Sequence, residues 1–168
     1  VGARCTAWIE GDDLHVRYDC DEPAIDRVAQ KMRRHDDPDL WTDNSVDLYF
    51  CPNGDRSTAY HVIANSLGVL YDSRMVFFGD STLRGGFTSD LAWGDGQVTA
   101  RVEKGKDRWS VEIAVPGPAV GGFVREMPMF FGRTRVVDGP EGMGIYGWGP
   151  AEVRSFLDTS NYGTVVLE

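Results

Sequence analysis

The residues best suited to bind a small polar ligand gather within the stretch 40–71. They are an indole, a carboxylate, a phenol, an imidazole and an amide: Trp41, Asp47, Tyr49, His61 and Asn65. The runs 46–51 and 60–65 alternate between apolar and polar side chains, and such alternation sends neighbouring residues to opposite faces of a β-strand. We expect the polar set on the non-core face of one sheet, with Trp41 at its entrance, where it suits a polar, ring-shaped ligand.

The elements that must position this set are short strands. A Pro-Asn-Gly turn at 52–54 predicts that 46–51 and 60–65 form an antiparallel pair. Further strands are expected at 3–10, 14–19, 97–103, 109–116, 129–137 and 162–167, with a short helix near 23–34 and a glycine-rich loop at 139–149. The sequence therefore predicts an all-β fold: an antiparallel β-sandwich of immunoglobulin or jelly-roll type with one helix.

Length and charge narrow the classes of function. A chain of 168 residues predicts one domain. The net charge of −9 argues against nucleic acid and against anionic membranes as partners. We find no apolar run long enough to span a bilayer and no signal peptide. Because the chain starts at Val1 inside a predicted strand, we expect a module excised from a larger protein.

Cysteines and acidic loops leave two questions open. A turn at 11–13 would place Cys5 opposite Cys20, as two buried thiols or as a disulfide. The acidic loops, with Asp36, Asp37 and Asp39 foremost, offer oxygen ligands for a metal such as calcium. No EF-hand, zinc motif, nucleophile elbow or phosphate-binding loop is present in the sequence.

Four blocks in order resemble one known family. They are Trp41 with the acidic strand after it, the strand ending in Asn65 before Gly68, the strand 109–116 that closes on proline, and the end of the chain from 147 to 167. Together they resemble family 9 carbohydrate-binding modules, which are related to the DOMON-like fold. The resemblance implies a non-catalytic β-sandwich that binds oligo- or polysaccharide and needs no cofactor, with structural calcium in many members.

The resemblance also implies roles for individual residues. Trp41 and Phe156 match the aromatic pair that clamps a sugar ring, with Trp148 as an alternative for the second position. Asp47 matches an acidic sugar ligand, while Ile63 stands where the characterised binder has an arginine. The full set expected to contact sugar is Trp41, Asp47, Asn65, Arg133, Arg135, Trp148 and Phe156.

Further expectations follow from the family. It implies a secreted, extracellular or periplasmic, multidomain protein of polysaccharide degradation, in which this module targets a carbohydrate-active enzyme to a terminal or reducing-end sugar. Two alternatives remain open. One is a haem-binding redox sandwich with His61 and Met75, Met127 or Met129 as axial ligands. The other is a sandwich that serves only for contacts within a larger protein.

Overall fold

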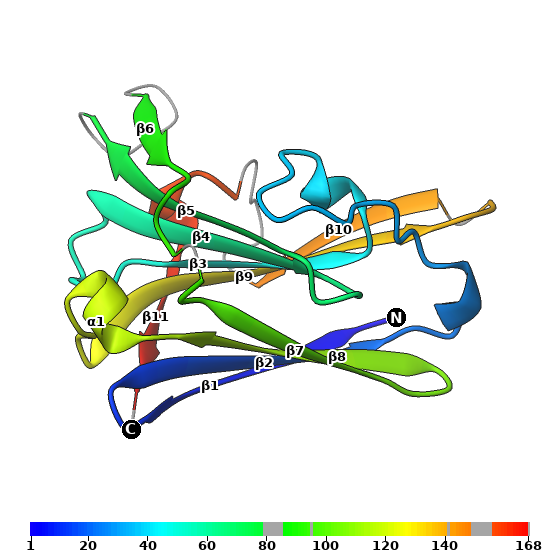
Figure 1. Ribbon diagram of the computed structural model, residues 1–168. Helices are drawn as coiled ribbons and strands as arrows, with labels where there is room; N and C mark the ends of the chain where they lie inside the picture. Colours follow the sequence, from blue (N-terminus) through cyan, green and yellow to red (C-terminus); the bar gives the residue numbers. More distant parts are fainter. Residues whose placement is uncertain (79–85, 95, 141, 149–155, 168) are drawn as a thin grey trace.

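Two antiparallel sheets face each other in the computed structural model, which describes residues 1–78, 86–94, 96–140, 142–148 and 156–167 (Figure 1). The smaller sheet, here sheet A, has its strands in the order β1 (Ala3–Glu10), β2 (Asp13–Asp21), β8 (Arg108–Val115) and β7 (Thr99–Lys104). The predicted all-β sandwich is confirmed.

The larger sheet, here sheet B, carries the candidate site. Its order is β10 (Gly142–Trp148), β9 (Glu126–Val137), β3 (Ser45–Phe50), β4 (Thr58–Asn65), β5 (Leu70–Phe77) and β6 (Phe87–Asp90), and β11 (Gly163–Val166) also pairs with β9. The short helical elements are η1 (Ile25–Arg27), η2 (Leu40–Thr42), α1 (Gly117–Val120) and η3 (Thr159–Asn161). None of the helices described is long and apolar enough to cross a membrane.

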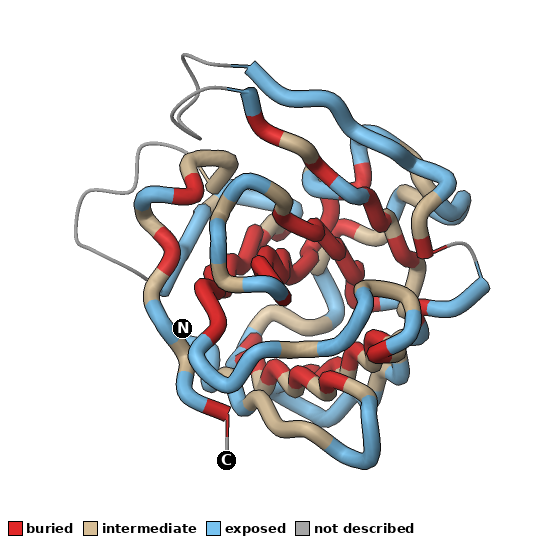
Figure 2. Tube along the Cα trace, turned by 90° about the vertical axis from the view of Figure 1, so that its left-hand side faces the viewer, coloured by how far each residue is buried: buried red, intermediate tan, exposed pale blue. Residues whose placement is uncertain are grey.

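The main core lies between the two sheets, where alternation on both inner faces supplies apolar side chains. Val46, Leu48 and Phe50 of β3 are fully buried there. Tyr18 crosses from sheet A and donates a hydrogen bond to the backbone oxygen of Asp47 at 2.7 Å. Figure 2 shows the buried residues running through the middle of the molecule, with exposed residues around them.

A second apolar cluster covers the other face of sheet B, called here the outer face. Its members come from four strands and from the C-terminal segment: Tyr49, Cys51, Ala59, Met75, Phe77, Phe130 and Tyr162, with Phe156 and Leu157 packed against them. The expectation that the non-core face of β3 and β4 is open to solvent is therefore wrong. Segment 156–162 packs on this face because the strands present aromatic side chains there as well.

The expected helix near 23–34 is present only as the 3-10 turn Ile25–Arg27. Beyond it, backbone groups bond to neighbouring elements: Ala29 donates to Val136 of β9 at 2.9 Å, and Val28 forms a β-bridge with Val137. Tertiary hydrogen bonds thus replace the intrahelical ones. The predicted loop at 139–149 contains β10, an edge strand that its glycines concealed, and neither β5 nor β6 was among the predicted strands.

The cysteine pairing is settled by the register of β1 and β2. Cys5 lies opposite Tyr18 and Cys20 lies opposite Ala3, so the two are offset diagonally rather than facing each other. Both are free thiols. Burial raises the pKa of each to about 12.

Candidate functional site

Trp41 presents an indole to solvent near the start of β3. Its turn η2 packs against β3, β4 and β9 and is anchored by the fully buried Leu40. The Thr42 hydroxyl donates to the backbone oxygen of Asp39 at 2.7 Å and helps to close the turn. Figure 1 shows η2 on the side of sheet B that faces away from sheet A. Trp41 is 44% exposed, so it is not sealed inside the protein.

Asp47 is the buried carboxylate of the outer face. Its Oδ1 lies 3.0 Å from Nε2 of His61, and the His61 ring stacks on Tyr49 with centroids 3.9 Å apart. Its Oδ2 is buried and has no hydrogen-bond partner. Burial, with Asp47 nearby, raises the pKa of the Tyr49 phenol well above its usual value, so this ring stays neutral. Oδ2 of Asp47 can therefore accept a further hydrogen bond.

Phe156 lies directly over the strand next to Asp47. A Cβ added to Gly132 would come within 2.7 Å of the Phe156 ring and 3.1 Å of the Asp47 Cβ. Gly147 leaves space for the same ring, whose centroid lies 4.7 Å from that of Phe130. The structure thus places Phe156 and Asp47 on either side of Gly132, on the same face of sheet B.

Asn65 is fully buried and all its side-chain groups are used locally. Its Nδ2 donates to Asp43 Oδ2 at 3.1 Å and to the Met32 oxygen at 3.2 Å. Its Oδ1 accepts from the backbone N–H groups of Leu67 and Val69, both at 3.0 Å. Asn65 therefore fixes the turn after β4, and no group is left for a ligand.

Arg133 and Arg135 lie on the opposite face of sheet B from Asp47. The register places Arg133 beside Val46, whose side chain is in the core, whereas Asp47 lies beside Gly132. The expectation that these arginines join Asp47 around one ligand is therefore wrong. Side chains on strands β3 and β9 alternate in phase, so Arg133 and Arg135 share the face that looks toward sheet A.

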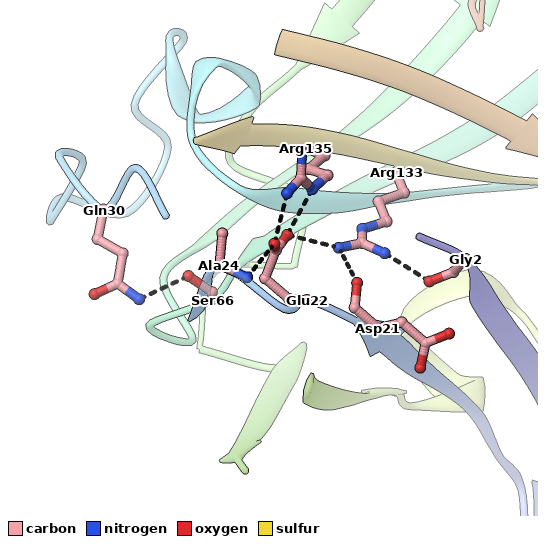
Figure 3. A network of polar contacts seen from close by, with 8 residues as sticks. All are labelled: Gly2, Asp21, Glu22, Ala24, Gln30, Ser66, Arg133 and Arg135. Atoms are coloured by element: carbon pink, nitrogen blue, oxygen red, sulfur yellow. Dashed lines mark hydrogen bonds and ion pairs between the residues drawn. The ribbon is translucent and has the colours of Figure 1, made fainter. Parts of the chain in front are cut away.

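Both arginines are held in a buried network around Glu22, which Figure 3 shows in detail. Arg135 donates two hydrogen bonds to the Glu22 carboxylate, each at 2.8 Å. Arg133 donates to Glu22 at 3.2 Å and to the backbone oxygens of Gly2 at 2.6 Å and Asp21 at 3.0 Å. The network fastens the start of β1 and the end of β2 to β9. Nothing in the sequence pattern singled out Glu22 as its centre.

Trp148 completes the predicted set, and Ile63 is the position at which the family binder has an arginine. Trp148 is 51% exposed and shares the face of its register partner Phe131, opposite to that of Phe156. Ile63 is buried beside Asp47 on the outer face and offers no donor to a ligand. The two aromatic residues proposed for the second clamp position thus lie on different faces of sheet B, and only Phe156 lies near Asp47.

The three aspartates expected to bind metal do not converge. Asp37 accepts from the Asp39 backbone at 3.1 Å and lies 3.5 Å from Arg34. Asp36 instead joins His35 and Asp72, with ligand atoms within 4.8 Å of one another. An imidazole in the set suits zinc-like ions better than calcium, which prefers oxygen ligands throughout. Calcium binding stays a prediction.

The haem alternative fits poorly. Met127 and Met129 lie in the core between the sheets, on the opposite side of sheet B from His61. Met75 shares the outer face, but it packs among the aromatic side chains of the second cluster. Since Nε2 of His61 contacts Asp47, the imidazole is already engaged.

Comparison with known proteins identifies the class of fold. No protein-family model and no curated protein sequence matches this chain. A candidate carbohydrate-binding protein from Bacteroides uniformis is similar in structure, with a TM-score of 0.74 and 16% identity over 99% of this chain and 78% of the other.

Two structures of a family 9 carbohydrate-binding module from Caldicellulosiruptor kristjanssonii also match over 99% of this chain. The complex with cellotriose gives a TM-score of 0.63 at 12% identity, over 75% of that chain. The complex with glucose gives 0.59 at 13%, over 76%. The chain therefore has the fold of family 9 carbohydrate-binding modules, and the resemblance in the sequence is confirmed at the level of the fold.

Proposed function

We propose that this protein is a non-catalytic carbohydrate-binding module in which Trp41 stacks on a sugar ring. The observation that carries the proposal is the exposed indole on the outer side of sheet B, next to the strand that holds Asp47. A pyranose has apolar C–H faces and a polar rim, so a flat aromatic ring covers the former and a carboxylate takes the latter. The similarity in fold to sugar-bound modules supports the same ligand class.

Asp47 would accept a hydroxyl proton through Oδ2, while His61 holds Oδ1. Because Oδ2 is buried, neighbouring side chains must shift for a sugar to reach it, and Phe156, which lies beside Gly132 next to Asp47, would then supply the second stacking surface. With Ile63 beside Asp47, no charged donor adds to the site. We therefore expect weak binding, with Kd between about 10 µM and 1 mM.

The biological setting is part of the same proposal. The module would direct an associated carbohydrate-active enzyme of a secreted, multidomain protein to plant-type polysaccharide, at a terminal or reducing-end sugar. Structural calcium belongs to this expectation. Support comes from the fold shared with sugar-binding modules and from the acidic net charge of −9, which is compatible with neutral ligands.

Calorimetric titration with glucose, xylose, cellobiose and xylobiose tests the proposal. If Trp41 covers about 100 Å² of sugar surface, Trp41→Ala should cost about 2.5 kcal/mol, or nearly two decades in Kd. Trp8→Ala is the matched control, because Trp8 stacks on His15 in sheet A, with centroids 5.2 Å apart, away from the site. Equal affinity in the Trp41→Ala and wild-type proteins would overturn the assignment.

Two further readouts separate the alternatives. Flat titrations with every sugar, from a protein with an intact fold, would favour the module that serves only for contacts. A Soret band in the purified protein would favour the haem-binding sandwich. We expect saccharide binding and no Soret band, because the outer face near His61 is filled by aromatic side chains.

A further inference from the structure

Two exposed aromatic residues lie on one face of the edge strand β10. Tyr146 is 47% exposed and Trp148 is 51% exposed. Their register partners on β9 are Arg133 and Phe131, which both face toward sheet A. The two rings therefore share the face opposite to that of Asp47, and as residues i and i+2 they are spaced by about 7 Å along the strand.

Glycine backbone lies beneath each ring. A Cβ on Gly144 would come within 2.7–3.0 Å of the Tyr146 ring and hydroxyl, and a Cβ on Gly163 would come within 2.8 Å of the outer edge of the Trp148 indole. Trp148 also leans on Phe131, with centroids 5.5 Å apart. The rings thus lie back against the protein, and each keeps about half of its surface in solvent.

Burial does not explain this arrangement. Large aromatic side chains are normally placed to remove apolar area from water, yet these two remain half exposed. The residues beneath them are glycines, which have no side chain to raise the rings away from the backbone. The strand Gly142–Trp148 contains no charged residue, in a chain with net charge −9. Among the described residues β10 pairs only with β9, so no described strand occupies the backbone groups along its other edge.

We propose that Tyr146 and Trp148 form a second carbohydrate-binding surface, the β10 platform, for a neutral polysaccharide chain that lies along β10. The class of ligand rests on the proposed function. The position does not, because the platform lies on the other face of sheet B from Trp41, Asp47 and Phe156. Successive sugar rings stack on the two aromatic side chains, and the free edge of the strand bonds their hydroxyl groups.

The platform requires a chain long enough to cover both rings, which sets it apart from the Trp41 site. We expect Tyr146→Ala and Trp148→Ala each to weaken binding to insoluble cellulose or xylan about tenfold, the effect of losing roughly 60 Å² of apolar contact. Affinity for glucose and cellobiose at the Trp41 site should stay unchanged. Depletion assays with the insoluble polysaccharides, beside calorimetry with the short sugars, measure both effects.

Ile145→Ala is the matched control, because Ile145 is 56% exposed on the same strand but faces the other way. Gly163→Ala gives a second test, because the added Cβ would displace the Trp148 indole without removing it. This variant should also bind less to the insoluble polysaccharides. Circular dichroism confirms the fold of each variant.

The outcomes separate the two sites. Loss of cellobiose binding in Trp41→Ala together with loss of polysaccharide binding in Tyr146→Ala/Trp148→Ala supports both. If the double variant binds insoluble polysaccharide as strongly as the wild-type protein, the platform is overturned even if the Trp41 site is real. Light scattering that shows a dimer dissociated by the double variant would also overturn it, by assigning the β10 edge to a second copy of the chain.

Discussion

Removing the carboxylate of Glu22 should be the most damaging single change outside the apolar core. Glu22 is fully buried and accepts hydrogen bonds from Arg133, Arg135 and the Ala24 backbone. Glu22→Ala would leave two buried guanidinium groups without their counter-charge. Breaking a buried ion pair by removing one partner costs about 3–5 kcal/mol.

Urea denaturation followed by tryptophan fluorescence measures this loss. With an m-value of about 2 kcal/mol/M, the midpoint should fall by about 1.5–2.5 M, and Tm should fall by about 10 °C. Asp21→Ala is the matched control: Asp21 is the neighbouring residue and is exposed, and only its backbone oxygen contacts Arg133. That variant should lose less than about 1 kcal/mol.

A reversal tests the cause. Removing both charges of the closest pair, in Glu22→Leu/Arg135→Met, should recover part of the stability lost in Glu22→Ala, because the double variant no longer buries the Arg135 guanidinium without a counter-charge. If Glu22→Ala and Asp21→Ala unfold at the same urea concentration, the network does not fasten the sheets and the reasoning is refuted.

Two other predictions concern the backbone and the thiols. Gly94→Ala should lower Tm by several degrees more than Gly96→Ala, because both glycines have positive φ (+85° and +71°) but only a Cβ on Gly94 would strike Asp72; equal Tm values would contradict this. Burial raises the pKa of the Cys5, Cys20 and Cys51 thiols to about 12. Alkylation by iodoacetamide at pH 8.5 should therefore be at least ~100-fold slower in the folded protein than in the urea-unfolded protein, because the thiolate is the reacting form. Because the fold favours the protonated thiols, their contribution to stability is complete below about pH 9 and is lost as pH rises toward 12, which unfolding curves across that range would show.

Local patterns were enough to predict most of the strands. Val46, Leu48 and Phe50 are buried as their alternation requires, and the β3–β4 pair forms with Asp47 opposite Ile63. The exposed position of Trp41 also agrees with its expected role at the entrance of a site. The pattern did not predict β10, because glycines at 142, 144 and 147 interrupt the apolar alternation by which strands are recognised.

The partners of the polar residues could not be read from the sequence. Arg133 and Asp47 lie 86 positions apart, and a shift of register by one residue would exchange their faces. The contact of Asp47 with His61, and those of Arg133 and Arg135 with Glu22, depend on which strands become neighbours.

The sequence by itself determined that this chain forms short antiparallel strands with aromatic and acidic residues between them, because the side-chain period of a strand is a local property. Only the tertiary structure decided which of those residues share a face. It placed Phe156 on the same face as Asp47, directed both arginines to Glu22 and put Tyr146 and Trp148 on one face of an edge strand. Strand order and register bring together residues that are far apart in the chain, and this pairing decides which side chains share a face on which a ligand can bind.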